Sequence, residues 1–300
     1  MKFGVHAGPQ NCSAAELRQV WRTAEDAGFD WISTWDHFYS NATRWDLDNF
    51  EAVATKAALA VLTSTVRVGS LVFSAGYRHP AVLANAAATI DHFSDGRLDL
   101  GLGAGWHQAE YDAFGLAFEP PATRLRRLAE FVEVVRLCWS NDNANYDGEF
   151  YQLRDAHGSP KPIQKLPPIW IGATGDRALA QAGRIADGWN TSAASPEEFA
   201  RRCEIVRANA PEPDRIMTGL NTLYLSSQPA GLDAELEKRL IHPSPQVTDY
   251  LLVADDYDAL GERIQAYADA GVQWLVLTQR APFDHDALTA FAENVIPAFR

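Results

Sequence analysis

Short apolar runs alternate with amphipathic stretches along almost the whole chain, and this alternation limits the fold more than any other feature. Eight apolar runs are expected to be strands, each followed by a stretch with helical spacing. They cover residues 2–7, 31–34, 66–73, 98–103, 169–172, a run near Trp189, 217–225 and 274–278. Strands that alternate with helices pair in parallel through right-handed crossovers. The pattern predicts an α/β protein built on a parallel sheet.

Local signals mark several of the intervening helices. Ser13 and Glu16 form a capping box, Gly28 stands where the same helix should end, and Pro80 occupies a first-turn position. The expected helices cover residues 13–26, 50–62, 80–93, 125–139, 176–185, 196–208, 257–270 and 286–298. Residues 140–168 and 228–255 break the rhythm and are expected to be insertions, the first of them hairpin-like.

A repeated helix-to-strand junction favours closure of the sheet. Residues 24–32 (AEDAGFDWI) resemble residues 268–275 (ADAGVQWL), and each segment places a glycine between helix and strand. An open doubly wound sheet is the alternative, but no strand near the N-terminus is followed by a phosphate-binding fingerprint. A length of 300 residues suits one α/β barrel. We predict a single (β/α)8 TIM-barrel domain over residues 1–300, with two insertions.

Charge and cysteine usage limit the partners and the compartment. The formal net charge of −13 argues against nucleic acid and anionic membranes as partners, because both require clustered lysine and arginine. The three cysteines are far apart and show no CxxC spacing, which fits a reducing compartment. Residues 1–7 lack a signal-peptide pattern, and no window approaches the ~20 apolar residues of a membrane span. A cytoplasmic location is expected.

Functional residues of such a barrel follow the C-terminal ends of the strands. Asp36 and His37 follow the second strand, where a carboxylate can fix the tautomer of an imidazole that exchanges protons. The alternative is a loop histidine that only binds backbone. Residues 101–105 form a GxGxG loop, followed by Trp106 and His107 and by no helix directly. Closely spaced glycines let a ring or a phosphate approach the backbone, although a plain turn fits this pattern equally well.

A second glycine-containing loop, residues 172–177, opens straight into a helix. Thr174 can donate its hydroxyl, Arg177 adds positive charge, and free N–H groups at the helix start can bind a phosphate. An ordinary capped loop is the alternative. A metal-dependent hydrolase is a further alternative, in which His6, His37, His79 and His107 would converge with Asp36. Since the sequence contains neither HExxH nor a Cys/His cluster, no metal is predicted.

Five ordered motifs resemble one family. They are TWDHF at 34–38, YRHPA at 77–81, DHFSDGR at 91–97, GLGAGW at 101–106 and PPIWIG at 167–172. Together they resemble the bacterial luciferase-like oxidoreductase superfamily, and most nearly its coenzyme F420-dependent branch. The resemblance runs from residue 1 to about residue 190 and returns in the last two strand–helix units.

The resemblance implies a deazaflavin lying across the strand ends. Asp36 and His37 match the family's Asp-His pair beside the ring, and Leu71-Val72 match a non-proline cis peptide that supports it. The implied cofactor-binding residues are Asp36, His37, Leu71, Val72, Gly103, Ala104, Gly105, Trp106, Gly172, Ala173, Thr174, Gly175, Asp176 and Arg177. Sugar-phosphate dehydrogenases of this branch carry a glutamate where this chain has Trp106, so their chemistry is doubtful here. Proton handling then falls to His37 or His107.

The expected activity is hydride transfer between F420 and an unidentified small organic substrate. Aromatic residues near the strand ends favour a flat or apolar substrate; they are Trp35, Phe38, Tyr39, Trp45 and Trp106. An FMN-dependent monooxygenase of the same fold, supplied with reduced flavin by a separate reductase, is the main alternative. A non-catalytic cofactor-binding protein is a more distant one. The family resemblance also makes a homodimer plausible.

Overall fold

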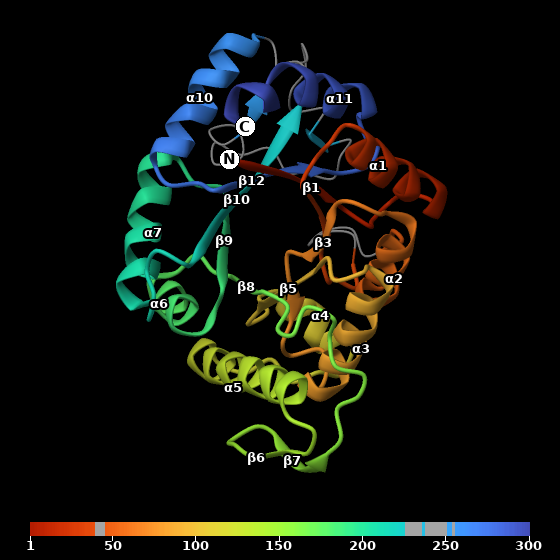
Figure 1. The fold of residues 1–300 in the computed structure, drawn as a ribbon, viewed down its shortest axis with the longest axis vertical. Coiled ribbons are helices and arrows are strands. Elements are labelled where there is room, and N and C mark those ends of the chain that lie inside the picture. Colours follow the sequence, from red (N-terminus) through yellow and green to blue (C-terminus); the bar gives the residue numbers. More distant parts are fainter. Residues whose placement is uncertain (40–45, 226–235, 238–250, 254–255) are drawn as a thin grey trace.

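The central sheet closes on itself. The computed structural model describes residues 1–39, 46–225, 236–237, 251–253 and 256–300. The strands follow one another in the order β10, β12, β1, β2, β3, β5, β8, β9, and β9 pairs back to β10. All of these pairs are parallel, and the helices form a ring outside them (Figure 1). The predicted (β/α)8 barrel is confirmed.

The barrel strands agree with the apolar runs at seven of eight positions. Their bounds are β1 Lys2–Ala7, β2 Trp31–Thr34, β3 Arg67–Ser70, β5 Leu98–Gly103, β8 Ile169–Gly172, β9 Gly188–Ser192, β10 Met217–Leu225 and β12 Trp274–Gln279. The exception is the run at 66–73, which the structure divides into β3 and the short β4, Phe73–Ser74. The Leu71–Val72 peptide between them is cis, as the family resemblance implied.

A bulge explains why that run is divided. β3 pairs Gly69 with Asp99 of β5, whereas β4 pairs Phe73 with Leu102, so β3–β4 holds one more residue than its partner over this interval. The Ser70 hydroxyl fills the gap, because it donates to the Gly101 carbonyl and accepts from the Gly101 N–H. The segment after Ser70 can therefore leave the sheet.

The helices largely follow their sequence signals. They are α1 Ala14–Asp26, α2 Ala52–Leu62, α3 Pro80–Phe93, α4 Gln108–Ala113, α5 Pro121–Ser140, α6 Asp176–Ile185, α7 Pro196–Asn209, α10 Tyr257–Asp269, α11 His285–Asn294 and the 3-10 turn η1 Ile296–Phe299. Both hydrogen bonds of the Ser13–Glu16 capping box form, and Gly28 has φ +83°. The short helix α4 was not expected. Within the described ranges, no helix is long and apolar enough to cross a membrane.

The first expected insertion is an antiparallel hairpin outside the barrel. It consists of β6, Ala144–Asp147, and β7, Gln152–Ala156, and lies beyond α5 in Figure 1. The second, at 228–255, falls mostly outside the described residues. Its described parts are residues 236–237 and 251–253, and the latter contain the short strand β11, Leu252–Val253, which pairs with the end of β10.

Three tryptophans fill the barrel at the N-terminal ends of its strands. Trp31 and Trp170 stack with ring centres 5.4 Å apart, and Trp274 meets both rings edge-on. Glycines make room for them, since a Cβ on Gly69 would lie 2.0 Å from Trp31 and one on Gly188 would lie 2.6 Å from Trp170. Because this end is packed, a ligand site is left to the opposite end, where the strands terminate.

Candidate active site

A cavity of about 470 Å³ opens at the C-terminal ends of the strands. This volume lies within the range of small-molecule and cofactor sites. Most of the predicted cofactor residues line it, namely Asp36, His37, Leu71, Val72, Gly103, Ala104, Gly105, Trp106, Gly172, Ala173, Thr174 and Gly175. The cavity is also lined by residues that were not among the predicted cofactor residues, which are Ser74, Tyr77, Ala178, Asn190, Thr191, Ser192 and Asn221. The expected convergence of loops from several strands at one rim is therefore observed.

Val72 forms the floor of a narrow slot between two glycines. A Cβ on Gly103 would lie 2.6 Å from Val72 Cγ2, and one on Gly172 would lie 3.1 Å from Val72 Cγ1. A side chain at Gly103 would collide with Val72, and one at Gly172 would press against it, so the two glycines keep this slot open. The Val72 side chain gives the slot an apolar floor, which suits the apolar face of a ring system.

His37 is held by a residue that the sequence did not reveal. Its Nδ1 lies 2.8 Å from Oε2 of Glu110, a side chain with no exposed surface on helix α4. Glu110 is 73 residues further along the chain, and no local pattern links the two. The unexpected helix α4 therefore carries the partner of the expected histidine.

Glu110 accepts hydrogen bonds from four groups of the described chain. The N–H groups of Phe38 and Tyr39 donate to Oε1, and the Tyr77 hydroxyl donates to Oε2 at 2.6 Å. Burial by itself raises the pKa of Glu110, but the hydrogen bonds from His37, Tyr77 and the backbone outweigh it and lower that pKa to about 2. Because the carboxylate is ionised and can only accept, Nδ1 of His37 carries the proton. Nε2 is left as the nitrogen that can exchange protons with a ligand.

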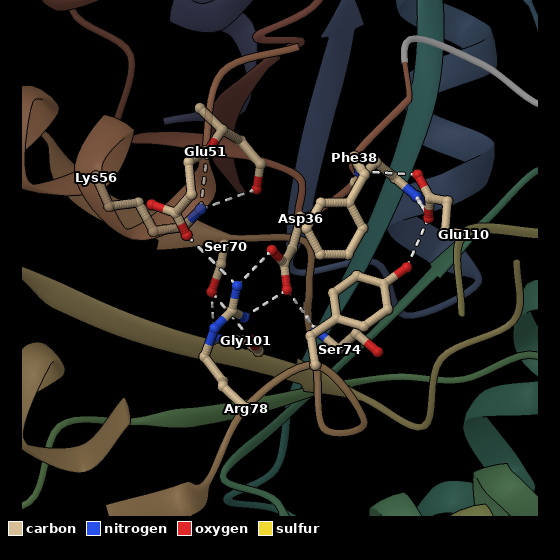
Figure 2. A network of polar contacts seen from close by, with 12 residues as sticks. Asp36, Phe38, Glu51, Lys56, Ser70, Ser74, Arg78, Gly101 and Glu110 are labelled. Carbon is tan, nitrogen blue, oxygen red and sulfur yellow. Dashed lines mark hydrogen bonds and ion pairs between the residues drawn. The ribbon is translucent and has the colours of Figure 1, made fainter. Parts of the chain in front are cut away.

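Asp36 does not orient His37, and that expectation was wrong. Its carboxylate is bound by Arg78 through two hydrogen bonds of 2.6 and 2.9 Å and by the N–H of Ser74 at 2.9 Å (Figure 2). These bonds tie the loop after β2 to the end of β4 and to the loop before α3. Although Asp36 borders the cavity, its charge is neutralised by Arg78. We therefore regard it as a positioning residue.

His107 lies behind Trp106 and does not line the cavity in the described part of the chain. Its ring stacks on Trp106 with centres 5.0 Å apart, and its side chain is largely buried. Nδ1 of His107 is 3.4 Å from the same Glu110 oxygen that binds His37. This position favours His37 over His107 as the group that meets a substrate.

The N-terminus of α6 forms the far wall of the cavity. Thr174, Gly175 and Ala178 line it, and Gly175 at the cap position contributes no side-chain hydrogen bond to the helix. N–H groups at this end are suited to bind an anion. Asp176 and Arg177 are exposed and outside the described lining, and Asp176 pairs with Arg201 on α7.

Comparison with known proteins identifies the family of this chain. The luciferase-like monooxygenase family matches residues 1–270. The chain belongs to this family. It is 28% identical over 334 residues to a protein named F420-dependent glucose-6-phosphate dehydrogenase from Nakamurella multipartita, covering 100% of this chain and 97% of the relative.

Two further relatives of this luciferase-like protein extend the comparison. A 5,10-methylenetetrahydromethanopterin reductase from Archaeoglobus fulgidus is 30% identical over 235 residues, which are 78% of this chain and 66% of the relative. An F420-dependent secondary alcohol dehydrogenase, solved with an F420–acetone adduct, superimposes with a TM-score of 0.85 over 100% of this chain and 99% of its own. At 21% identity, this last likeness bears on the fold alone.

A metal could be held by His37, His107 and Glu110, whose ligand atoms lie within 4.8 Å of one another. Binding a metal there would displace the hydrogen bonds that His37 and Tyr77 donate to Glu110. The four histidines considered from the sequence do not converge. His79 caps α3, and His6 is buried against Ser33, with burial lowering its pKa to about 3. We therefore assign no metal to this luciferase-like site.

Trp45, one of the aromatic residues expected near the strand ends, lies outside the described residues.

Proposed function

We propose that this luciferase-like chain is an oxidoreductase that moves hydride between coenzyme F420 and a small organic substrate. The observation that carries the proposal is His37, whose proton position is fixed by Glu110 at the edge of the slot above Val72. The name of the 28% identical relative supports F420 as the cofactor.

The chain offers complementary surfaces to both ends of such a cofactor. The Val72 floor and its flanking Gly103 and Gly172 would hold the flat ring, and the N-terminus of α6 would hold a phosphate of the tail. A chain with a net charge of −13 needs such local donors, because its overall field repels anions. When bound, F420 supplies or accepts a hydride, and the protein contributes orientation and exclusion of water.

His37 would exchange the proton that accompanies the hydride. In the reducing direction, a substrate double bond takes up one hydride at carbon and one proton from Nε2 of His37, and becomes a single bond. His37 is then reprotonated from solvent, which reaches it because about a quarter of its side chain is exposed. Glu110 stabilises the protonated ring and keeps Nε2 directed away from the α4 side.

Equilibrium titration distinguishes F420 from FMN. We expect purified protein to quench F420 fluorescence with saturation in the micromolar range or below, and to bind FMN much more weakly. Tight binding of FMN without binding of F420 would instead favour a two-component monooxygenase, and monooxygenase is the activity in the family's name. The cytoplasmic location and the homodimer remain predictions.

His37→Ala tests the proton-handling role. We expect kcat for hydride transfer to fall by about 10²–10⁴-fold, the usual contribution of a positioned acid or base. The dissociation constant of F420, measured by the same titration, separates loss of chemistry from loss of binding. His92→Ala is the matched control, because this exposed histidine of α3 lies outside the described lining of the cavity. Unchanged turnover in His37→Ala would remove His37 from the mechanism.

A further inference from the structure

Trp106 is a prominent surface of the cavity that the proposed hydride transfer leaves without a role. The residue is 66% exposed, yet it lines the same cavity as His37. Tryptophan ordinarily buries most of its large apolar surface. An indole left open beside a proposed proton donor therefore suggests a surface that a ligand covers.

The loop that carries Trp106 is firmly held on both sides. Gly105 has φ +79°, and a Cβ there would lie 2.0 Å from the Tyr111 hydroxyl. Arg124 donates a hydrogen bond to the Gly105 carbonyl, and the N–H of Gln108 donates to the Trp106 carbonyl at 3.1 Å. A binding surface on such a loop is formed before the ligand arrives, which lowers the entropic cost of binding.

Two neighbouring rings orient the indole. The His107 ring stacks on it at an interplanar angle of 19°, and the His37 ring meets it at 74° with centres 5.5 Å apart. A planar group stacked on the uncovered part of Trp106 would therefore lie close to His37. This is the position that a substrate needs if its reacting bond is to receive a proton from Nε2.

The charge of the cavity limits what this group can be. No lysine or arginine belongs to the lining, as far as the described residues define it. The carboxylate of Asp36 is already paired with Arg78. Apart from His37 while it is protonated, a phosphate or carboxylate beside Trp106 would find no cationic side chain among these residues, and burying an unpaired charge is costly.

We propose that Trp106 determines substrate specificity by stacking on an uncharged, planar, conjugated or aromatic part of the substrate, whose reacting bond then lies against His37. This inference rests on the proposed function. It also separates this chain from relatives named for a sugar phosphate, whose substrate carries charge and no planar ring.

Two ketones that share one reacting group provide the test. Trans-4-phenyl-3-buten-2-one carries a phenyl ring conjugated to the enone, and but-3-en-2-one lacks the ring. Binding of each is measured by calorimetry to protein saturated with oxidised F420, so that no hydride is transferred. The kcat/KM of each is then measured with reduced F420. We expect the phenyl compound to bind at least about tenfold more tightly, consistent with aromatic stacking plus burial of the ring.

The variants assign that preference to the indole. Trp106→Ala should lower the affinity ratio and the kcat/KM ratio of the two ketones about tenfold, and Trp106→Phe should restore most of both ratios. Equal affinity for the two ketones, no detectable binding of the phenyl compound, or an unchanged ratio in Trp106→Ala would each overturn the inference. Failure of F420 itself to bind would instead overturn the proposed function, so the two failures are distinguishable.

Discussion

Lys56 shows how a fully buried amine is accommodated without a carboxylate in contact. Its Nζ donates to the Thr34 hydroxyl at 2.7 Å and to the Thr34 carbonyl at 3.4 Å, and it lies 4.4 Å from the centre of the Phe73 ring. Burial lowers the pKa of Lys56 to about 7, because the nearby charges of Asp36 and Glu51 do not offset desolvation. The amine thus packs beside Thr34 and Phe73 at a cost that depends on pH.

The sign of that dependence can be measured with Lys56→Met. Between pH 7 and about 10.5 the unfolded chain keeps this lysine protonated while the native chain does not, so stability rises with pH across that window. We expect the melting temperature of the wild type, relative to that of Lys56→Met, to increase from pH 7 to pH 10. A difference in melting temperature that stays flat over this range would show that the native pKa is not depressed.

At the scale of elements, replacing glycine by alanine should have opposite effects on the free energy of unfolding in a helix and in a strand. Gly261 lies inside α10, where an added Cβ meets nothing within 4 Å and φ is not positive. Gly101 lies in β5, where an added Cβ would be 1.8 Å from the Ser70 carbonyl oxygen. Gly101 is therefore required by the bulge that sets the cavity floor, whereas Gly261 only weakens its helix.

Urea unfolding of the two alanine variants tests this contrast. Gly261→Ala should raise the free energy of unfolding by about 0.5–1 kcal/mol, the difference in helix propensity. Gly101→Ala should lower it by about 1–3 kcal/mol or more, because backbone must move. Equal effects of the two substitutions would contradict the placement of the bulge.

At the scale of the whole molecule, the two ends of the described chain lie side by side. The Met1 amino group donates to the Phe299 carbonyl at 2.8 Å, and β1 pairs with β12 along its length (Figure 1). The exposed loop at residues 211–215 precedes β10 and so lies at the end of the barrel away from the cavity. The stability of the folded barrel should then depend on closure of the sheet and not on the point at which the chain begins and ends.

A circular permutant checks this expectation. Joining Arg300 to Met1 through a short glycine–serine linker and opening the chain between Glu212 and Pro213 should preserve the far-ultraviolet spectrum and F420 affinity. The melting temperature should stay within about 5 °C of the parent, equivalent to a few kcal/mol at most. Loss of cooperative unfolding would show that the order of folding along the chain matters.

The local pattern was enough to predict the barrel, since strand and helix periodicity, the Ser13–Glu16 box and Gly28 depend on neighbours within a few residues. It also placed His37 and the two glycine loops at one rim, because parallel strands end together. The partner of His37 and the role of Asp36 were decided only by tertiary structure. Glu110 is 73 residues from His37 in the chain, and Arg78 is 42 residues from Asp36. Such contacts depend on how separate βα loops meet in space, and the spacing of residues along the chain does not encode this.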